Sequence, residues 1–508
     1  MSSTVSSASP PGPGGPPAPP SPPAAPPDGS PDGSPAAPAT AGGKAGRLDP
    51  AVVRMALVLV LGAIAPLLDS TVVNVALRTL SRDFAAPVAQ VQWVTTGYLL
   101  SLALAIPASG WAVDRFGAKR LWIAALLLFL TGSMLCAIAW NLDALIAFRV
   151  LQGVGGGVML PVLQTLLIRA ADGGRTPLGR LMSVVTLPAL VAPIFGPVVG
   201  GLIVGHASWR WIFLINAPIC LAGALLAGRV LPPDPPARAA RLDLPGLLLL
   251  SPAVAALVYG LAQVGSLGGF AHPAVLVPLA GGAVLAAGFV AWTLRARIPV
   301  PLVDLRLLRV RSFAASSSLL FLSGLSMFGS MLLLPLYYQQ VRGASVVGAG
   351  LLMAPQGVGS LLARGAGALT DRFGPRPVLL GAIAAMTVGT VPFVVTGEVN
   401  TVLLAAALVL RGAGLSAANM AVMVGAYRGL DRAQIPHAST MTRIAQQIGA
   451  SFGTAVLAVI LQSQLSAHPG AAGARTAYGH AFLWALIFAA GSIVPALLLP
   501  RAPKAEQS

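Results

Sequence analysis

Apolar segments of about 20 residues recur along almost the whole chain and constrain its fold more than any other feature. A helix of this length spans the hydrocarbon core of a bilayer. Each segment must be helical, because hydrocarbon offers no partner for unsatisfied backbone groups and the alternation of a membrane barrel is missing. The sequence therefore predicts an all-α integral membrane protein with fourteen transmembrane helices. The predicted spans are residues 52–77, 89–113, 118–140, 143–168, 181–205, 211–230, 244–262, 273–294, 313–338, 346–369, 377–397, 401–427, 434–465 and 479–500.

The composition supports membrane insertion and excludes several other classes of protein. Of the 508 residues, 56% are hydrophobic and 9% are charged, whereas a soluble domain carries about 25% charged residues. The net charge of +17 comes from basic residues scattered between the apolar segments, not gathered on one face as nucleic-acid binding would need. Both cysteines lie in apolar segments and the five histidines show no metal-ligand spacing. We expect no metal, no nucleic-acid partner and no enzymatic activity.

The basic residues also predict the orientation of the chain. An even number of spans places both termini on one side, and with the N-terminus inside most of the 32 Lys and Arg residues lie on the cytoplasmic side. This asymmetry follows the positive-inside rule and predicts a multi-pass protein of the cytoplasmic membrane. Residues 1–48 are rich in Pro, Ala, Gly and Ser, so we expect a disordered cytoplasmic tail there and not a cleavable signal peptide.

One acidic residue lies well inside an apolar segment. Asp69 is followed by a continuing apolar pattern that includes Val72 and Val73. An acid at a bilayer centre costs about 2.5 to 3.5 kcal/mol and usually faces a bundle interior or a wet cavity. The hypothesis is that Asp69 takes up and releases a proton. The alternative is a solvated acid at the end of a shorter span that stops at Leu68.

A repeat divides the chain into two related halves. GWAVDRFGAKR at Gly110–Arg120 reappears 257 residues later as GALTDRFGPRP at Gly367–Pro377, and the same shift carries the first span onto the ninth. Two six-helix halves related by an axis along the membrane normal describe the major facilitator fold, with its ligand site between the halves. The predicted parts are a six-helix bundle at 49–230, two inserted helices at 231–298, a second six-helix bundle at 299–500 and a cytoplasmic tail at 501–508.

Five motifs resemble the fourteen-helix drug:proton antiporter branch of the major facilitator superfamily, over about residues 52–500. They are LDSTVVNVAL at Leu68–Leu77, GWAVDRFGAKR, RVLQGVGGG at Arg149–Gly157, PIFGPVVGG at Pro193–Gly201 and WRWIFLINAPI at Trp209–Ile219. The resemblance implies proton-driven export. It also implies that Asp114 latches onto a helix N-terminus of the opposite half, where the positive end of the helix dipole favours an acid.

Arg149 is a second charge within the first bundle. A guanidinium stays protonated at any relevant pH, so its burial requires a partner. We predict that Arg149, on the same helix face as Gln152, reaches Asp69 directly or through water. Desolvation there disfavours the charged carboxylate and the arginine favours it, so a modest rearrangement could change its protonation. The alternative is an arginine that extends to the outer surface near Asp143.

Glycines and charges near helix ends predict a conformational switch. Gly117 makes the turn after the second helix, and Pro197 removes a backbone donor and bends the fifth. The predicted switch residues are Gly110, Asp114, Arg115, Gly117, the weaker mirror copy Asp371 and Arg372, and Gly196, Pro197, Gly200 and Gly201. Solvated turns and simple helix packing are the alternatives. The glycines of RVLQGVGGG lie within a membrane helix, so they indicate close helix packing and not a phosphate loop.

Polar, aromatic and Met side chains of the central spans predict the substrate cavity, because such surfaces suit varied apolar ligands. The spans of the second half contain no acid, so neutral or weakly amphipathic compounds fit better than dicationic drugs. Packing is the alternative role for each residue. The predicted cavity residues are Asn74, Trp93, Tyr98, Gln152, Met327, Ser330, Tyr337, Met353, Gln356, Ser360, Asn419, Met423 and Gln447.

These features together predict proton-coupled efflux of lipophilic small molecules, such as drugs or antibiotics, by alternating access. We expect a monomer in contact with membrane lipids, with protons as the coupling ion and no other cofactor. A lipid or glycolipid flippase on the same fold is one alternative. A non-transporting membrane scaffold that acts through its Pro-rich tail is another.

Overall fold

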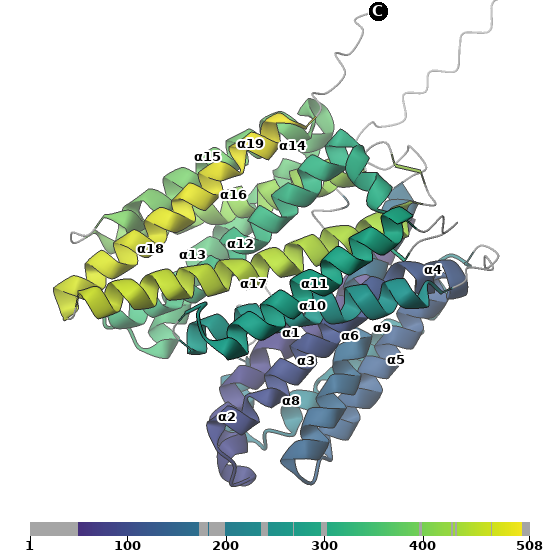
Figure 1. Cartoon of the computed structure of the whole chain (residues 1–508), viewed down its shortest axis with the longest axis horizontal. Helices are drawn as coiled ribbons and strands as arrows, with labels where there is room; N and C mark the ends of the chain where they lie inside the picture. Colours follow the sequence, from purple (N-terminus) through teal and green to yellow (C-terminus); the bar gives the residue numbers. More distant parts are fainter. Residues whose placement is uncertain are drawn as a thin grey trace, which may run out of the picture. The chain divides into compact units, whose positions relative to one another are not determined.

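A computed structural model describes residues 49–171, 181, 199–234, 242–267, 269–295, 302–395, 399–427, 430–431, 434–468 and 470–499. By its internal contacts the chain divides into two units, Met1–Arg47 and Leu48–Ser508, and every described residue belongs to the second. All regular structure in these residues is helical (Figure 1). The predicted all-α fold is confirmed, whereas the two predicted tails lie outside the described residues.

The helices follow the chain as two groups separated by an inserted pair. The first group consists of α1 (Pro50–Asp83), α2 (Val88–Val91), α3 (Trp93–Ala105), the 3-10 turn η1 (Ile106–Ala108), α4 (Ser109–Phe116), α5 (Ala118–Ala137), α6 (Leu142–Ala171), residues 199–206, α8 (Trp211–Leu214) and α9 (Asn216–Val230). The inserted pair is α10 (Leu244–Ser266) and α11 (Pro273–Arg295). The second group consists of η2 (Leu305–Arg309), α12 (Arg311–Gln340), α13 (Val346–Leu362), η3 (Ala363–Gly365), α14 (Ala366–Phe373), α15 (Pro375–Val394), α16 (Thr401–Tyr427), α17 (Ile435–Ala467), α18 (Ala471–Gly491) and α19 (Ile493–Leu497).

Twelve of the described helical segments are long and apolar enough to cross a membrane. These twelve segments correspond to twelve of the fourteen predicted spans, and the fifth and tenth predicted spans have no counterpart among them. The fifth falls mainly on 182–198, outside the described residues, and the tenth is divided into α13, η3 and α14. The last helix begins at Ala471, earlier than the predicted 479, because its first turns include polar residues that hydropathy alone does not report.

The two halves repeat each other in secondary structure as well as in sequence. A 257-residue shift carries η1 onto η3, α4 onto α14 and α5 onto α15 without any change of length. Gly117 and Gly374 hold the same turn with φ of 88° and 85°. Only glycine adopts this backbone region without strain, so each turn before α5 and α15 requires the glycine that the repeat provides.

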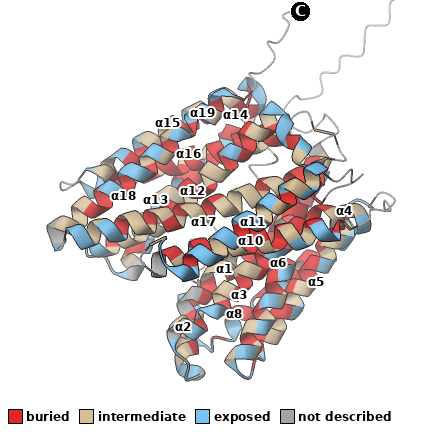
Figure 2. Cartoon of the chain, in the orientation of Figure 1, coloured by how far each residue is buried: buried red, intermediate tan, exposed pale blue. Residues whose placement is uncertain are grey.

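The outer surfaces of the helices are apolar, as a lipid environment demands. In α11, Val277, Val284 and Leu294 expose 70%, 70% and 68% of their surface. Figure 2 shows exposed residues along α18 as well. Water would disfavour so much exposed apolar area. The described chain is therefore a multi-pass membrane protein.

The hydrophobic core of the first half consists of separate clusters, and α1 contributes residues to two of them. The segment from Met55 to Ala65 packs with α5, α6 and α9, together with Phe313, Tyr427 and Ile435 of the second half. The segment from Val72 to Leu80 packs in a separate cluster with residues of α5, α6 and α8. Asp69 lies between the two clusters.

Candidate functional site

A buried ion pair lies inside the first bundle. Asp69 is 2% exposed and Arg149 is fully buried. The Nη1 atom of Arg149 contacts the Oδ2 atom of Asp69, and its Nε donates to the carbonyl oxygen of Val94 at 3.1 Å. The structure therefore places neither residue at a water-exposed helix end, and it brings the two predicted proton-coupling residues into direct contact.

Two amides complete the surroundings of the carboxylate. Gln152 accepts from Nη1 of Arg149 at 2.8 Å and donates to Oδ1 of Asp69 at 3.2 Å. Asn216 donates to the same Oδ1 at 3.3 Å and to the hydroxyl of Ser133 at 3.0 Å. Gln152 was predicted to line the cavity, but the structure makes it a partner of both charges. Asn216 lies within the motif WRWIFLINAPI, yet its role was not predicted.

Aromatic rings cover the guanidinium. The centre of the Arg149 guanidinium lies 4.1 Å from the ring centroid of Tyr98 and 5.7 Å from that of Phe213. The hydroxyl of Tyr98 donates to the carbonyl oxygen of Pro66 at 3.3 Å. Cation–π contacts are strengthened by desolvation. Tyr98, another predicted cavity residue, is thus fully buried beside the ion pair.

This arrangement can couple a proton to helix packing. An ionised Asp69 holds partners from α6 and α9, and these partners are side-chain donors that prefer a charged acceptor. A protonated Asp69 would leave Arg149 as an unpaired buried cation, which is strongly unfavourable. Protonation of Asp69 would therefore change the interactions that join α1 to α6 and α9.

Polar contacts join the halves at the end that carries the Gly117 and Gly374 turns. Asp114 Oδ2 lies 3.3 Å from Nε2 of His437, in the first turn of α17. Nδ1 of His437 lies 3.1 Å from the carbonyl oxygen of Leu302. Both ring nitrogens face acceptors, so an imidazolium that donates from both satisfies this geometry. A Cβ atom on Gly110 would lie 3.2 Å from Oγ1 of Thr440, so this glycine allows the close approach.

Two pairs of hydroxyls lie at the same inter-half contact. Ser109 and Thr440 are 2.9 Å apart, and so are Thr165 and Ser439. All four residues are buried. Asp114 thus contacts a residue in the first turn of α17, and its partner is the side chain of His437, for which no role was predicted.

The other predicted switch residues have separate environments. Arg115 is exposed beside the Gly117 turn, and Asp234 accepts from the backbone amides of Lys119 and Arg120 at 2.8 and 3.0 Å, so this acid caps α5. Asp371 and Arg372 are both exposed, and Arg372 lies over the Phe373 ring at 5.0 Å. Gly196 and Pro197 lie outside the described residues. A Cβ atom on Gly200 would lie 3.0 Å from the backbone of α1, whereas one on Gly201 would meet nothing within 4 Å.

The glycines of RVLQGVGGG pack against neighbouring helices. A Cβ atom on Gly155 would lie 2.7 Å from the backbone nitrogen of Phe129 in α5, and one on Gly157 would lie 3.0 Å from Cβ of Ala105 in α3. Both glycines lie inside α6. Close helix packing therefore explains this motif.

The predicted cavity residues do not come together in one place. Trp93 stacks on Tyr259 of α10 with ring centroids 5.9 Å apart, and the side chain of Asn74 lies outside what the structure describes. Tyr337 is buried in an aromatic cluster with Tyr338, Phe393, Tyr478 and Phe482, so it belongs to the interior of the second half. Methionines and amides fill half-buried or buried positions within the second half; these are Met327, Met353, Asn419, Met423 and Gln447.

The remaining three predicted cavity residues lie near α16. Ser360 donates to the carbonyl oxygen of Gly412 at 3.2 Å. Ser330 and Gln356 both accept from Arg411, an arginine of α16 that had no predicted role. The spacing in the sequence predicted which helix face each of these residues lies on, but it did not predict that Arg411 binds Ser330 and Gln356.

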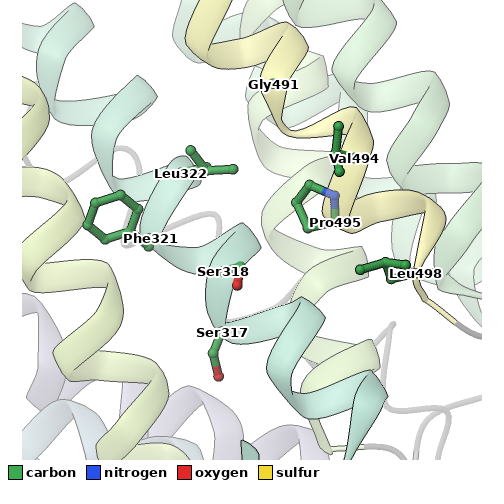
Figure 3. Close-up of a pocket in the computed structure, with 8 residues that line it drawn as sticks. All are labelled: Ser317, Ser318, Phe321, Leu322, Gly491, Val494, Pro495 and Leu498. Atoms are coloured by element: carbon green, nitrogen blue, oxygen red, sulfur yellow. The ribbon is translucent and has the colours of Figure 1, made fainter.

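A surface groove of about 630 Å³ lies within the second half, between α12 and the junction of α18 with α19 (Figure 3). It forms where α18 ends at Gly491 and α19 turns away. None of the predicted cavity residues lines it. Its lining residues are Ser317, Ser318, Phe321, Leu322, Gly491, Val494, Pro495 and Leu498.

Comparisons with known proteins agree with this architecture. Residues 59–454 match the Major Facilitator Superfamily. The chain is 42% identical over 424 residues to the multidrug resistance protein B homolog of Mycobacterium tuberculosis, covering 83% of this chain and 78% of the relative. It is 31% identical over 453 residues to the putative multidrug resistance protein MdtD of Salmonella heidelberg, covering 89% and 95%. The crystal structure of the human organic anion transporter MFSD10 (TETRAN) has a similar fold, with a TM-score of 0.57 and 16% identity, over 87% of this chain and 100% of that one.

Two related helical groups, a buried ion pair inside the first of them and an apolar outer surface, together with these relatives, define a multi-pass membrane transporter and not an enzyme. The chain belongs to the Major Facilitator Superfamily.

Proposed function

We propose that this protein exports lipophilic small molecules, including drugs or antibiotics, across the cytoplasmic membrane in exchange for protons. The observation that carries the proposal is the fully enclosed ion pair of Asp69 and Arg149. The names of the relatives, which refer to multidrug resistance, support the substrate class. The proposed orientation has both termini in the cytoplasm, and the proposed working form is a monomer that needs no cofactor besides protons.

The wild-type protein in proteoliposomes provides the direct test. With radiolabelled chloramphenicol as a neutral probe, an imposed pH gradient should drive transport toward the more acidic side. Exchange of one proton per molecule gives about a tenfold concentration ratio for each pH unit, because a tenfold ratio corresponds to about 1.4 kcal/mol. Nigericin, which collapses the gradient, should remove the accumulation. If no lipophilic antibiotic tested responds to the gradient, the proposal of proton exchange is wrong.

Alternating access requires the inter-half contact to open in every cycle. Ser109→Cys together with Thr440→Cys places two thiols where the hydroxyl oxygens are 2.9 Å apart, and the native cysteines Cys136 and Cys220 are buried. Oxidation should cross-link the halves and stop transport completely, and a reductant should restore it. Each single cysteine variant is the matched control. Full transport by the cross-linked protein would contradict alternating access at this contact.

A lipid or glycolipid flippase is a second candidate, favoured by the groove of Figure 3. Apolar side chains line most of this groove, and it lies between helices that are long enough to span the membrane. Scrambling of fluorescent phospholipid by proteoliposomes that transport no drug would favour the flippase. Drug transport without scrambling would exclude it.

A further inference from the structure

The interior of the second half contains a cation with only neutral partners. Arg411 is 4% exposed in α16. Its Nε donates to the hydroxyl of Thr390 at 3.2 Å, its Nη1 to the side-chain oxygen of Gln356 at 3.5 Å and its Nη2 to the hydroxyl of Ser330. These bonds satisfy three of the five N–H donors that a guanidinium carries. The contact with Gln356 is long, and Gln356 is half-buried, so it is the partner that a ligand displaces most easily.

The six long helices of the second half contain no counter-ion for Arg411. The sequences of α12, α13, α15, α16, α17 and α18 include neither Asp nor Glu. A guanidinium remains charged at any relevant pH, and burying a charge without an opposite charge is strongly unfavourable. Hydroxyl and amide oxygens offset only part of that cost, so the site favours an added anion.

The repeat shows what this site lacks. A Cβ atom on Gly132 would contact Gln152 in the first half, and one on Gly389, 257 residues later, would contact Arg411. Arg411 therefore occupies, in the second half, the position that Gln152 occupies in the first half, where Gln152 is the neighbour of Arg149. The same shift carries Asp69 onto Ser326, a buried serine. The first half thus supplies its own carboxylate, whereas the second half has the cation and a serine at the acid's position.

A second arginine of this half has an open donor. Arg443 in α17 donates from Nη1 to Gln446 at 2.7 Å, while its Nε is buried without a hydrogen-bond partner among the described residues. The second half therefore has a second cation in its interior, on α17.

From these observations we infer that Arg411 binds the anionic group of an exported compound, and that the preferred substrates are lipophilic organic acids, with a carboxylate as the simplest case. This inference rests on the proposed export function and specifies its substrate class. Ser330, Thr390 and Gln356 hold the guanidinium in place, and the carboxylate displaces Gln356. The neutral compounds favoured by the sequence alone would be weaker ligands.

Calorimetric binding to the purified full-length protein tests this inference with two probes of nearly equal size, 2-naphthylacetate and 2-naphthylacetamide. At about pH 7.5 the acid is ionised, because carboxyl groups titrate near pH 4. The wild type should bind the acid at least about tenfold more tightly than the amide, as hydrogen bonds to charged groups imply. Arg411→Gln should remove this preference, and Arg411→Lys should keep part of it. Arg364→Gln, which removes an exposed arginine, is the matched control and should keep the full preference.

Ser326→Asp gives a second test that leaves Arg411 intact. It installs a carboxylate at the position related by the repeat to Asp69, so it should remove the preference for the acid and raise the thermal stability.

Three results would overturn the inference. The first two are that the wild type does not prefer the acid, and that Arg411→Gln weakens the binding of both probes equally. The third is that the binding that depends on Arg411 is binding of chloride and not of the acid. Parallel transport of chloramphenicol separates the two proposals, since proton exchange can fail while Arg411-dependent binding of the acid remains.

Discussion

Asp69→Asn is expected to abolish pH-gradient-driven transport, reducing it to the rate of protein-free liposomes. Asparagine has nearly the same shape and can still accept hydrogen bonds from Gln152 and Asn216. It cannot exchange a proton, and it presents the same charge at every pH. The measurement is accumulation of a labelled antibiotic in proteoliposomes at a series of imposed pH gradients.

Exchange without a gradient separates loss of coupling from loss of folding. The Asp69→Asn protein should still exchange labelled for unlabelled substrate across the membrane, because that reaction needs no net proton movement. Asp143→Asn is the matched control, since it removes an exposed acid from the start of α6 and should leave gradient-driven transport intact. Unchanged accumulation by Asp69→Asn would show that the proton is carried elsewhere.

Arg149→Met should produce the largest loss of stability. It leaves the carboxylate of Asp69 buried without its cation, and breaking a buried ion pair from one side costs about 3–5 kcal/mol. The double variant Asp69→Asn with Arg149→Met removes both charges and should regain most of that stability without regaining gradient-driven transport. Equilibrium unfolding in detergent would measure the free energies of the wild type, the two single variants and the double variant.

The matched control for the arginine is Arg364→Met, which removes an exposed guanidinium and should change the free energy of unfolding by less than about 0.5 kcal/mol. Coupling between Asp69 and Arg149 appears as non-additivity of the two single changes. If the effects simply add, the two side chains do not stabilise each other, and the argument for a charge-dependent helix arrangement is lost.

The features that hydropathy and repetition determine were predictable from the sequence. Helices follow from the lack of backbone partners in hydrocarbon, and the 257-residue shift located two equivalent turns, at Gly117 and Gly374, in advance of the structure. The contact of Asp69 with Arg149 was also predictable, because buried charges of opposite sign have few other partners. These inferences needed only composition, spacing and the cost of burying charge.

The remaining parts of the site depend on distances between helices, which no local pattern encodes. Asn216 meets both Asp69 and Ser133 only because α9 packs against α1 and α5, and a single serine in an apolar helix gives no signal. His437 gave none either, since its partner Asp114 is more than 300 residues away. The aromatic cluster around Tyr337 was not predicted, because an aromatic side chain has the same sequence pattern in a core as at a ligand surface.

The position of Pro66 in α1 has a mechanical consequence. Proline lacks the N–H that would bond to the carbonyl oxygen one turn earlier, at Gly62, and Asp69 follows less than a turn later. The segments on either side belong to different hydrophobic clusters, so a bend at this joint can tilt one segment while each cluster keeps its own packing. Gain or loss of a single hydrogen ion at Asp69 would then change the angle between the two segments of α1, and neither hydrophobic cluster would have to unfold.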